Sequence, residues 1–313
     1  MSLNNLISIS NLKQKEFQEL IEKAERIKRN PVIYARSLFE KSLLMIFQAP
    51  SLRTRLSFET AMTQLHGQAI NYYTEHSPWG LGKESIEDVA KVISRYCNIA
   101  SARIYSHSEL KKLAKNSSIP IVNAMTNDGH PCQVLGDFLT IKEHLEKTSN
   151  LKIAYLGDAK NNVTYSLMRA CALTGNKISI ACPSKKDYYP EQKIIKEAKN
   201  LIKKHKSKST ISITTTPTKA VKNADIIYTD SWMSYRIPQK EKETRLKHLK
   251  PFQVNKTIFS KAKKTALFMH CLPAKRGHEV TKEVIDSKRS IVFDQAENRL
   301  HIQKSILLTL LGR

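Results

Sequence analysis

The segment Leu43-Leu44-Met45-Ile46-Phe47-Gln48-Ala49-Pro50-Ser51-Leu52-Arg53-Thr54-Arg55 combines a strand, a turn and the start of a helix. Its first five residues form a continuous apolar run, which is typical of a strand buried on both faces of a parallel sheet. From residue 53 to residue 65 the apolar side chains recur at helical spacing. A buried strand that leads directly into a helix predicts the first unit of an α/β fold.

The same alternation continues along the whole chain, after a helix predicted at 11–29. In the first half the sequence predicts strands at 69–73, 99–105 and 119–123, and helices at 86–96, 109–114 and 132–144. In the second half it predicts strands at 151–155, 177–182, 210–214, 226–229, 266–270 and 290–293, and helices at 162–173, 192–204 and 296–310. The polar segment 146–150 separates the halves. We therefore predict an α/β fold of two domains, each with a central parallel sheet flanked by helices, and a ligand cleft between them.

The charge of the chain is strongly positive, with 52 Lys and Arg against 28 Asp and Glu among 313 residues, a net charge of +24. Such a charge invites a nucleic-acid hypothesis, but the lysines are spread out, and no zinc finger, heptad array or aromatic-rich sheet motif accompanies them. A basic surface that attracts small anionic substrates is the favoured interpretation, and we predict no nucleic-acid partner.

Three further features concern the compartment. No apolar run is long enough for a membrane helix, and the first residues lack the basic and apolar regions of a secretory signal. The five cysteines are scattered without a CxxC spacing, which disfavours a disulfide framework or a structural zinc site. The sequence predicts a cytoplasmic protein without a membrane association.

The residues Ser51 to Arg55 carry the clearest chemical pattern. Hydroxyl groups and two guanidinium groups at a helix start suit a phosphate, because free backbone N–H groups and the helix dipole favour anions there. The alternative is an ordinary helix start, with Ser51 as the cap and arginines on the surface.

Three other segments share this placement at a strand end or a helix start. They are His130-Pro131-Cys132-Gln133, His270-Cys271-Leu272-Pro273 and Ala296-Glu297-Asn298-Arg299. A single histidine beside a proline is usually structural, but ligands of parallel sheets bind at the carboxyl ends of the strands. The four segments together predict an active site.

Together with Arg103 in Ser-Ala-Arg-Ile-Tyr, these motifs resemble the aspartate/ornithine carbamoyltransferase family over nearly the whole chain. The His-Cys-Leu-Pro segment, residues 157–162 and residues 229–234 resemble the ornithine branch. The resemblance implies a carbamoyl-phosphate-binding domain at 1–147, an ornithine-binding domain at 148–294 and a C-terminal helix, 295–313, that packs back on the first domain. It also implies transfer of a carbamoyl group from carbamoyl phosphate to L-ornithine, no metal or organic cofactor, and a homotrimer or a multiple of trimers.

The resemblance assigns roles to matching residues. It implies that Arg103, His130, Asp230 and Cys271 are catalytic. Carbamoyl phosphate would contact Ser51, Leu52, Arg53, Thr54, Arg103, His130, Gln133, Cys271, Leu272 and Arg299. Ornithine would contact Asn162, Asp230, Ser234 and Tyr235.

Purely structural roles stay open as alternatives for four of the residues in or near these motifs. Arg55 could position the motif, Gln133 could be a plain helix residue, Cys271 a buried thiol and Asp230 a helix cap.

Three positions depart from the family pattern. Gln48-Ala49-Pro50 replaces a usual Glu-Lys, Tyr235-Arg236 replaces Met-Gly, and Gly80 replaces a polar residue that reaches the phosphate of a neighbouring subunit. The second departure keeps another amine open as substrate, such as putrescine or an N-acylated ornithine. A non-catalytic binding protein has no need for the charged site residues, and a nucleotide-dependent oxidoreductase would need GxGxxG, which residues 157–160 lack.

Overall fold

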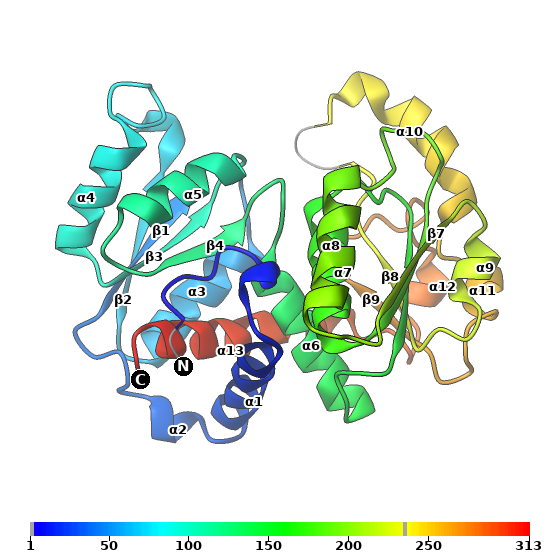
Figure 1. Ribbon diagram of the computed structural model, residues 1–313, viewed down its shortest axis with the longest axis horizontal. Helices are drawn as coiled ribbons and strands as arrows, with labels where there is room; N and C mark the ends of the chain where they lie inside the picture. The colour runs from blue at the N-terminus through cyan, green and yellow to red at the C-terminus, as the bar shows by residue number, and fades with distance from the viewer. Residues whose placement is uncertain (1–2, 234–236) are drawn as a thin grey trace. The chain divides into compact units, whose positions relative to one another are not determined.

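The computed structural model describes residues 3–233 and 237–313 (Figure 1). The chain divides into two compact units. Unit 1 comprises Met1–Leu139 with Glu297–Arg313, and unit 2 comprises Thr140–Ala296. The division falls within two helices, α6 (Pro131–Leu145) and α13 (Val292–Leu310). The C-terminal part of α13 therefore belongs to the same unit as the N-terminal half of the chain.

The sheet of unit 1 is parallel, with the strand order β2-β1-β3-β4. Its strands are β1 (Ser42–Phe47), β2 (Gln68–Tyr73), β3 (Ile99–Arg103) and β4 (Ile121–Met125). The central strands β1 and β3 are almost wholly buried, as the continuous apolar run of β1 requires, whereas the edge strand β2 alternates between exposed and half-buried residues.

Helices cover both faces of this sheet. Figure 1 shows α4 and α5 on one face and α3 with α13 on the other. The first face is sealed by an apolar cluster that joins strand residues such as Ile46 and Ala102 to Val89 of α4 and Leu110 of α5. The helices of unit 1, besides its parts of α6 and α13, are α1 (Gln14–Arg29), α2 (Pro31–Tyr34), α3 (Arg53–Gln64), α4 (Ile86–Tyr96) and α5 (His107–Asn116), with short 3₁₀ turns at Ile9–Asn11 and Thr74–His76.

The sheet of unit 2 is also parallel, with the strand order β7-β6-β5-β8-β9. Its strands are β5 (Lys152–Leu156), β6 (Lys177–Ala181), β7 (Thr210–Thr214), β8 (Ile226–Thr229) and β9 (Leu267–His270). The order reverses between β5 and β8, and this switch point is where ligands of open parallel sheets bind.

The helices of unit 2 again lie on both faces of its sheet. Figure 1 shows α7 and α8 on one face and α9, α11 and α12 on the other. Bounds for the helices that lie within unit 2 are α7 (Asn162–Thr174), α8 (Gln192–Lys204), α9 (Pro217–Val221), α10 (Lys242–Leu249), α11 (Lys256–Phe259) and α12 (Lys282–Ile285), with 3₁₀ turns at Gln239–Glu241 and Lys250–Phe252.

The predicted fold class, two α/β domains with parallel sheets flanked by helices, is confirmed. The predicted strand at 290–293 is wrong. Only Ser290 pairs with β9, as an isolated bridge to Phe268, and α13 already begins at Val292. Asp294 in the first turn favours the helix, because a negative charge interacts well with the positive end of the helix dipole.

Gly80 is required by the local backbone. A Cβ atom at this position would lie 1.7 Å from the carbonyl oxygen of Thr74, so no other residue fits without rearrangement. The Gly80 N–H donates to the Ser77 Oγ at 3.0 Å, which holds this turn in place. The departure from the family pattern at Gly80 therefore has a steric cause in this chain.

No helix of the described ranges combines the length and the apolar character that a membrane span requires.

Candidate functional site

The phosphate-binding segment predicted at residues 51–55 forms the start of α3. The Ser51 Oγ accepts a hydrogen bond from the Thr54 N–H at 3.1 Å, so this serine caps the helix. Arg53 is half-buried, and the Leu52 side chain is exposed. A cavity of about 330 Å³ borders the segment, lined by residues 47–51 and by Arg55, Tyr73 and Glu75. The helix start thus opens onto a hollow large enough for a small anion.

Arg55 also lines this cavity, but its guanidinium group is engaged with two protein side chains. Its Nε donates to the Glu59 Oε1 at 3.1 Å, and its guanidinium group lies 5.7 Å from the centroid of the Tyr73 ring. Its contacts are therefore with the protein.

Arg299 connects α13 to two predicted site residues. Its Nη1 donates to the Gln133 Oε1 at 2.7 Å and its Nη2 to the Thr54 Oγ1 at 3.2 Å. All three side chains are buried. Gln133 is therefore more than a plain helix residue, because it fixes a guanidinium group beside the phosphate segment.

Two residues that sequence reasoning missed support this arrangement. Asp137 is fully buried one turn after Gln133 and accepts a hydrogen bond from its Nε2 at 2.8 Å. A Cβ atom at Gly136 would lie 3.3 Å from the Cδ of Arg299, so glycine leaves room for the arginine. The i,i+4 spacing of Gln133 and Asp137 within a largely apolar helix could have indicated from the sequence that these two polar side chains contact each other.

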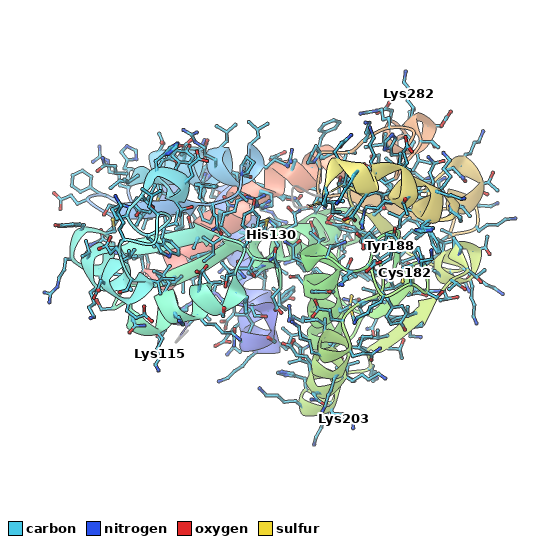
Figure 2. All side chains as sticks on the ribbon, turned by 90° about the horizontal axis from the view of Figure 1, so that it is seen from above. Lys115, His130, Cys182, Tyr188, Lys203 and Lys282 are labelled. Atoms are coloured by element: carbon cyan, nitrogen blue, oxygen red, sulfur yellow. The ribbon has the colours of Figure 1, made fainter. Side chains whose placement is uncertain are left out.

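His130 is buried at the start of α6 and is labelled in Figure 2. Burial lowers its pKa well below the usual value, and the positive charges of Arg299, Arg103 and Arg53 lower that pKa further. Three guanidinium groups therefore act on one imidazole, which is neutral at pH 7. Arg103 is itself buried at the end of β3 and donates its Nε to the Ala49 carbonyl at 3.3 Å.

We expect this histidine to make the stability of the protein depend on pH. In the unfolded chain His130 is protonated near pH 6.5, whereas in the folded state its lowered pKa keeps it neutral at that pH. The free energy of unfolding should therefore fall as the pH drops below about 6.5. The slope contributed by His130 should approach 1.4 kcal/mol per pH unit, the value for about one proton. Urea unfolding of wild type and His130→Gln between about pH 7 and pH 5 measures it, because the other histidines are common to both. Equal slopes in the two proteins would contradict a neutral His130.

In unit 2, Asp230 and Cys271 follow the ends of the adjacent strands β8 and β9. The Cys271 Sγ donates to the Asp230 Oδ1 at 3.0 Å, and the Ser231 N–H donates to the same oxygen at 2.7 Å. Residues 231–233 are not helical, so Asp230 is not a helix cap. Cys271 is half-buried rather than enclosed in the core. The Asp230 carboxylate and the Cys271 thiol are therefore in direct contact beyond the ends of two adjacent strands.

The backbone after Cys271 is held in an unusual conformation. Leu272 has φ 58°, in the left-handed region that costs a branched residue about 1–2 kcal/mol. Its N–H donates to the His270 Nδ1 at 2.8 Å. Nδ1 therefore acts as the acceptor, and the ring Nε2 lies 3.5 Å from the buried Glu279 carboxylate. Glu279, which sequence reasoning missed, thus places a carboxylate beside the histidine that precedes Cys271.

Arg245 of α10 is another residue that the sequence did not single out. It is buried, donates its Nε to the Trp232 carbonyl at 3.0 Å and forms an ion pair with Asp158. Its guanidinium group lies 5.0 Å from the centroid of the Tyr188 ring, which Figure 2 labels. It therefore fixes the segment that immediately follows Asp230. Lysine and arginine are so frequent in this sequence that position alone gave no signal.

The other ornithine-binding residues are placed as follows. Asn162 is the first residue of α7, and the preceding Asn161 caps that helix through the Thr164 N–H at 2.8 Å. Ser234 and Tyr235 lie outside the described residues.

Ligand atoms of Asp230, His270 and Cys271 lie within 4.8 Å of one another, a donor set of the kind that zinc accepts. In this structure the atoms are engaged with protein groups, since the thiol donates to the carboxylate and Leu272 donates to the imidazole. The absence of a metal from the reaction stays a prediction.

Comparison with known proteins extends over the whole chain. Residues 4–143 match the carbamoyl-P binding domain of aspartate/ornithine carbamoyltransferase, and residues 149–310 match its Asp/Orn binding domain.

Curated relatives are similar over almost their full length. The ornithine carbamoyltransferase of Methanococcus aeolicus is 42% identical over 302 residues, covering 96% of this chain and 97% of the relative. That of Archaeoglobus fulgidus is 43% identical over 313 residues, covering 99% and 98%.

Solved structures are also similar to this chain over almost its whole length. Ornithine transcarbamoylase from Giardia lamblia superposes with a TM-score of 0.90 at 40% identity, covering 99% of each chain. Ornithine carbamoyltransferase from Pyrococcus furiosus gives a TM-score of 0.92 at 41% identity, covering 99% of this chain and 97% of that one. The chain belongs to the aspartate/ornithine carbamoyltransferase family.

Proposed function

We propose that this protein is an ornithine carbamoyltransferase, which converts carbamoyl phosphate and L-ornithine to L-citrulline and phosphate. The observation that carries the proposal is the convergence of Arg53, Arg103 and Arg299 on a neutral His130 in the unit that matches a carbamoyl-phosphate-binding domain. Full-length relatives named ornithine carbamoyltransferase support the choice of amine.

In this proposal unit 1 binds carbamoyl phosphate. The N–H groups at the start of α3, with Ser51, Leu52, Arg53 and Thr54, hold the phosphate dianion. Arg103 and neutral His130 donate hydrogen bonds to the carbonyl oxygen, where negative charge develops in the tetrahedral transition state. Donors fixed in advance at such an oxygen are worth about 3–4 kcal/mol each.

Two further residues of unit 1 hold the carbamoyl end. Gln133 binds the carbamoyl amide, and Arg299 lies against it. The hydrogen bond between these two side chains keeps both in place without bound substrate.

Unit 2 supplies the amine. Asn162 and Ser234, with Tyr235, bind the amino-acid head group, while Asp230 and Cys271 orient the side-chain amine. A free alkyl amine has a pKa near 10.4, so presenting it neutral at pH 7 costs about 4–5 kcal/mol. The hydrogen bond between the Cys271 thiol and the Asp230 carboxylate supports Asp230 as the acceptor of the amine proton.

The reaction is a direct displacement. The amine nitrogen forms a bond to the carbonyl carbon and loses a proton, and the bond from that carbon to the phosphate oxygen breaks. The phosphate leaves with the electron pair. Cys271 and Leu272 border the carbamoyl group on the side of the amine.

Several properties complete the proposal. The domains are those at 1–147 and 148–294, with 295–313 returning to the first. The family resemblance supports a homotrimer or a multiple of trimers, and the product would enter arginine biosynthesis. All five cysteines are free thiols, which supports a cytoplasmic location.

A panel of amines tests the proposal. With carbamoyl phosphate as donor, kcat/KM should be more than about 100-fold higher for L-ornithine than for putrescine, which lacks the α-carboxylate. That ratio corresponds to about 2.7 kcal/mol, within reach of a site whose buried polar groups would otherwise lose their partners. N-acetyl-ornithine should also react poorly. Comparable rates with putrescine or with N-acetyl-ornithine would contradict ornithine as the substrate while keeping carbamoyl transfer.

A further inference from the structure

A cavity of about 1030 Å³ lies in unit 2 where strands β5, β6 and β7 begin. The first residues of these strands, Lys152, Lys177 and Thr210, line it. Asp230 and Cys271 instead follow the carboxyl ends of β8 and β9 in the same parallel sheet. The cavity therefore lies at the amino-terminal ends of the strands, and the candidate residues Asp230 and Cys271 lie at the carboxyl ends. Nothing in the proposed reaction uses the cavity.

The lining of this cavity is strongly basic. Lysine and arginine make up 52 of the 313 residues of the chain, but six of the fifteen lining residues are lysines, against one carboxylate. Its charged residues are Lys152, Lys177, Lys208, Lys219, Lys222, Lys263 and Asp225. The concentration of positive charge is thus well above that of an already basic chain.

The single carboxylate is already engaged. The Asp225 Oδ1 accepts a hydrogen bond from the Lys263 Nζ at 2.6 Å, and its Oδ2 accepts one from the Lys152 N–H at 2.8 Å. Within the described ranges, the other four exposed lysines of the lining form no ion pair. The Lys263 ammonium group is compensated by Asp225, and the Lys152 Nζ donates to the Lys222 carbonyl at 2.6 Å. The other four ammonium groups line a shared space without a counter-charge among the residues that the structure describes.

The register of the sheet places two of the six lining lysines side by side. Lys152 and Lys177 are paired residues on the neighbouring strands β5 and β6, which lie about 4.8 Å apart. Like charges at paired positions destabilise a sheet. Burial lowers the pKa of Lys152, and the positive charges of Lys177 and Lys222 lower it further. A bound anion would relieve this repulsion.

The remaining lining residues indicate the kind of anion. Thr210 and Asn223 add neutral hydrogen-bond donors, as does the Ser179 hydroxyl, which accepts a hydrogen bond from the Ser212 Oγ at 3.0 Å. The volume exceeds the needs of a single phosphate, and the lysines come from several separate elements. None of the fifteen lining residues is aromatic, whereas proteins that bind single-stranded nucleic acid stack bases on aromatic rings.

We propose that this cavity binds a small molecule that carries a chain of linked phosphate groups. Either a linear polyphosphate or the triphosphate of a nucleotide offers that chemistry. The ammonium groups neutralise successive phosphates, and the hydroxyl and amide groups donate to the oxygens between them.

Isothermal titration with sodium tripolyphosphate tests this proposal. The titration uses the full-length protein carrying Arg53→Ala, which removes the competing phosphate site, at ~10 mM salt, where screening is weak. Adding Lys177→Gln and Lys219→Gln should raise Kd at least tenfold. The control pair Lys196→Gln and Lys282→Gln removes the same charge from exposed positions outside the cavity and should leave Kd unchanged.

Equal weakening by both pairs would show attraction to the overall charge and would overturn the proposal, as would the absence of any heat of binding. Circular dichroism checks that the variants fold, and Lys208→Gln with Lys222→Gln is the substitute pair if the first does not. Inorganic phosphate that binds as tightly as tripolyphosphate would contradict the need for linked phosphates. A single-stranded RNA that binds more tightly than tripolyphosphate and loses affinity in the same variant would reassign the cavity to nucleic acid.

Comparison with ATP separates the two sources of the phosphate chain. A Kd for ATP equal to or below that for tripolyphosphate assigns the cavity to nucleotides. A higher Kd for ATP assigns it to linear polyphosphate, and both results support recognition of the phosphate chain.

Discussion

Replacing Arg53 with alanine should lower kcat/KM for carbamoyl phosphate by about 10³-fold or more, equivalent to about 4 kcal/mol of transition-state stabilisation. Arg53 is half-buried at the start of α3 and contributes positive charge at His130. A charge-assisted contact to a dianion is among the strongest that a side chain can make. The thermal melting curve should change little, because the guanidinium group serves the ligand rather than the core.

Arg55→Ala is the matched control, on the same helix turn. Its guanidinium group is exposed and contacts Glu59 and Tyr73, so the loss of activity should stay below about tenfold, or 1.4 kcal/mol. If Arg53→Ala retained more than a tenth of wild-type activity, or if both variants lost activity equally, the assignment of Arg53 to the phosphate would be wrong.

Replacing Asp230 with asparagine should lower kcat/KM for ornithine by about 10³-fold, within the range for loss of a group that takes up a proton. In the wild type, kcat/KM for ornithine should rise between about pH 6 and pH 8, because the free amine is the reacting form and its pKa lies near 10.4. Binding of carbamoyl phosphate to the free enzyme should be unaffected, since Asp230 lies in unit 2, for which we propose the ornithine site.

Asp225→Asn provides the comparison at the other end of the same strand, where the carboxylate contacts Lys152 and Lys263. Ornithine kinetics should be unchanged in this variant. Equal loss of ornithine use and of carbamoyl-phosphate affinity in Asp230→Asn, measured by inhibitor binding, would assign Asp230 a structural role.

Most of the fold was predictable because most strands of the two sheets are short, largely apolar segments that alternate with helical periods. The predicted bounds of β7, β8, α4 and α8 coincide with the observed ones. The prediction of a strand at 290–293 was wrong because a short apolar run has no period of its own, and the helix that follows extends back to Val292. Short helices such as α9 and α11 give too few turns for a periodic pattern.

The site was predictable only where a motif marked it. The sequence singled out Arg299 and Gln133 as separate residues, and the hydrogen bond between them became visible only in the fold. Asp137, Glu279 and Arg245 are buried polar residues that contact residues of the motifs but lie outside the motifs themselves. Such support depends on three-dimensional neighbours, so the order of residues does not reveal it.

The most direct measurement of the central claim is the identity of the product. The purified protein is supplied with ¹³C-labelled carbamoyl phosphate and L-ornithine, and the products are analysed by mass spectrometry and phosphate assay. We expect labelled citrulline and phosphate in equal amounts with the wild type and neither above background with Arg53→Ala. Phosphate release without labelled citrulline, or citrulline formation that persists in Arg53→Ala, would contradict the account.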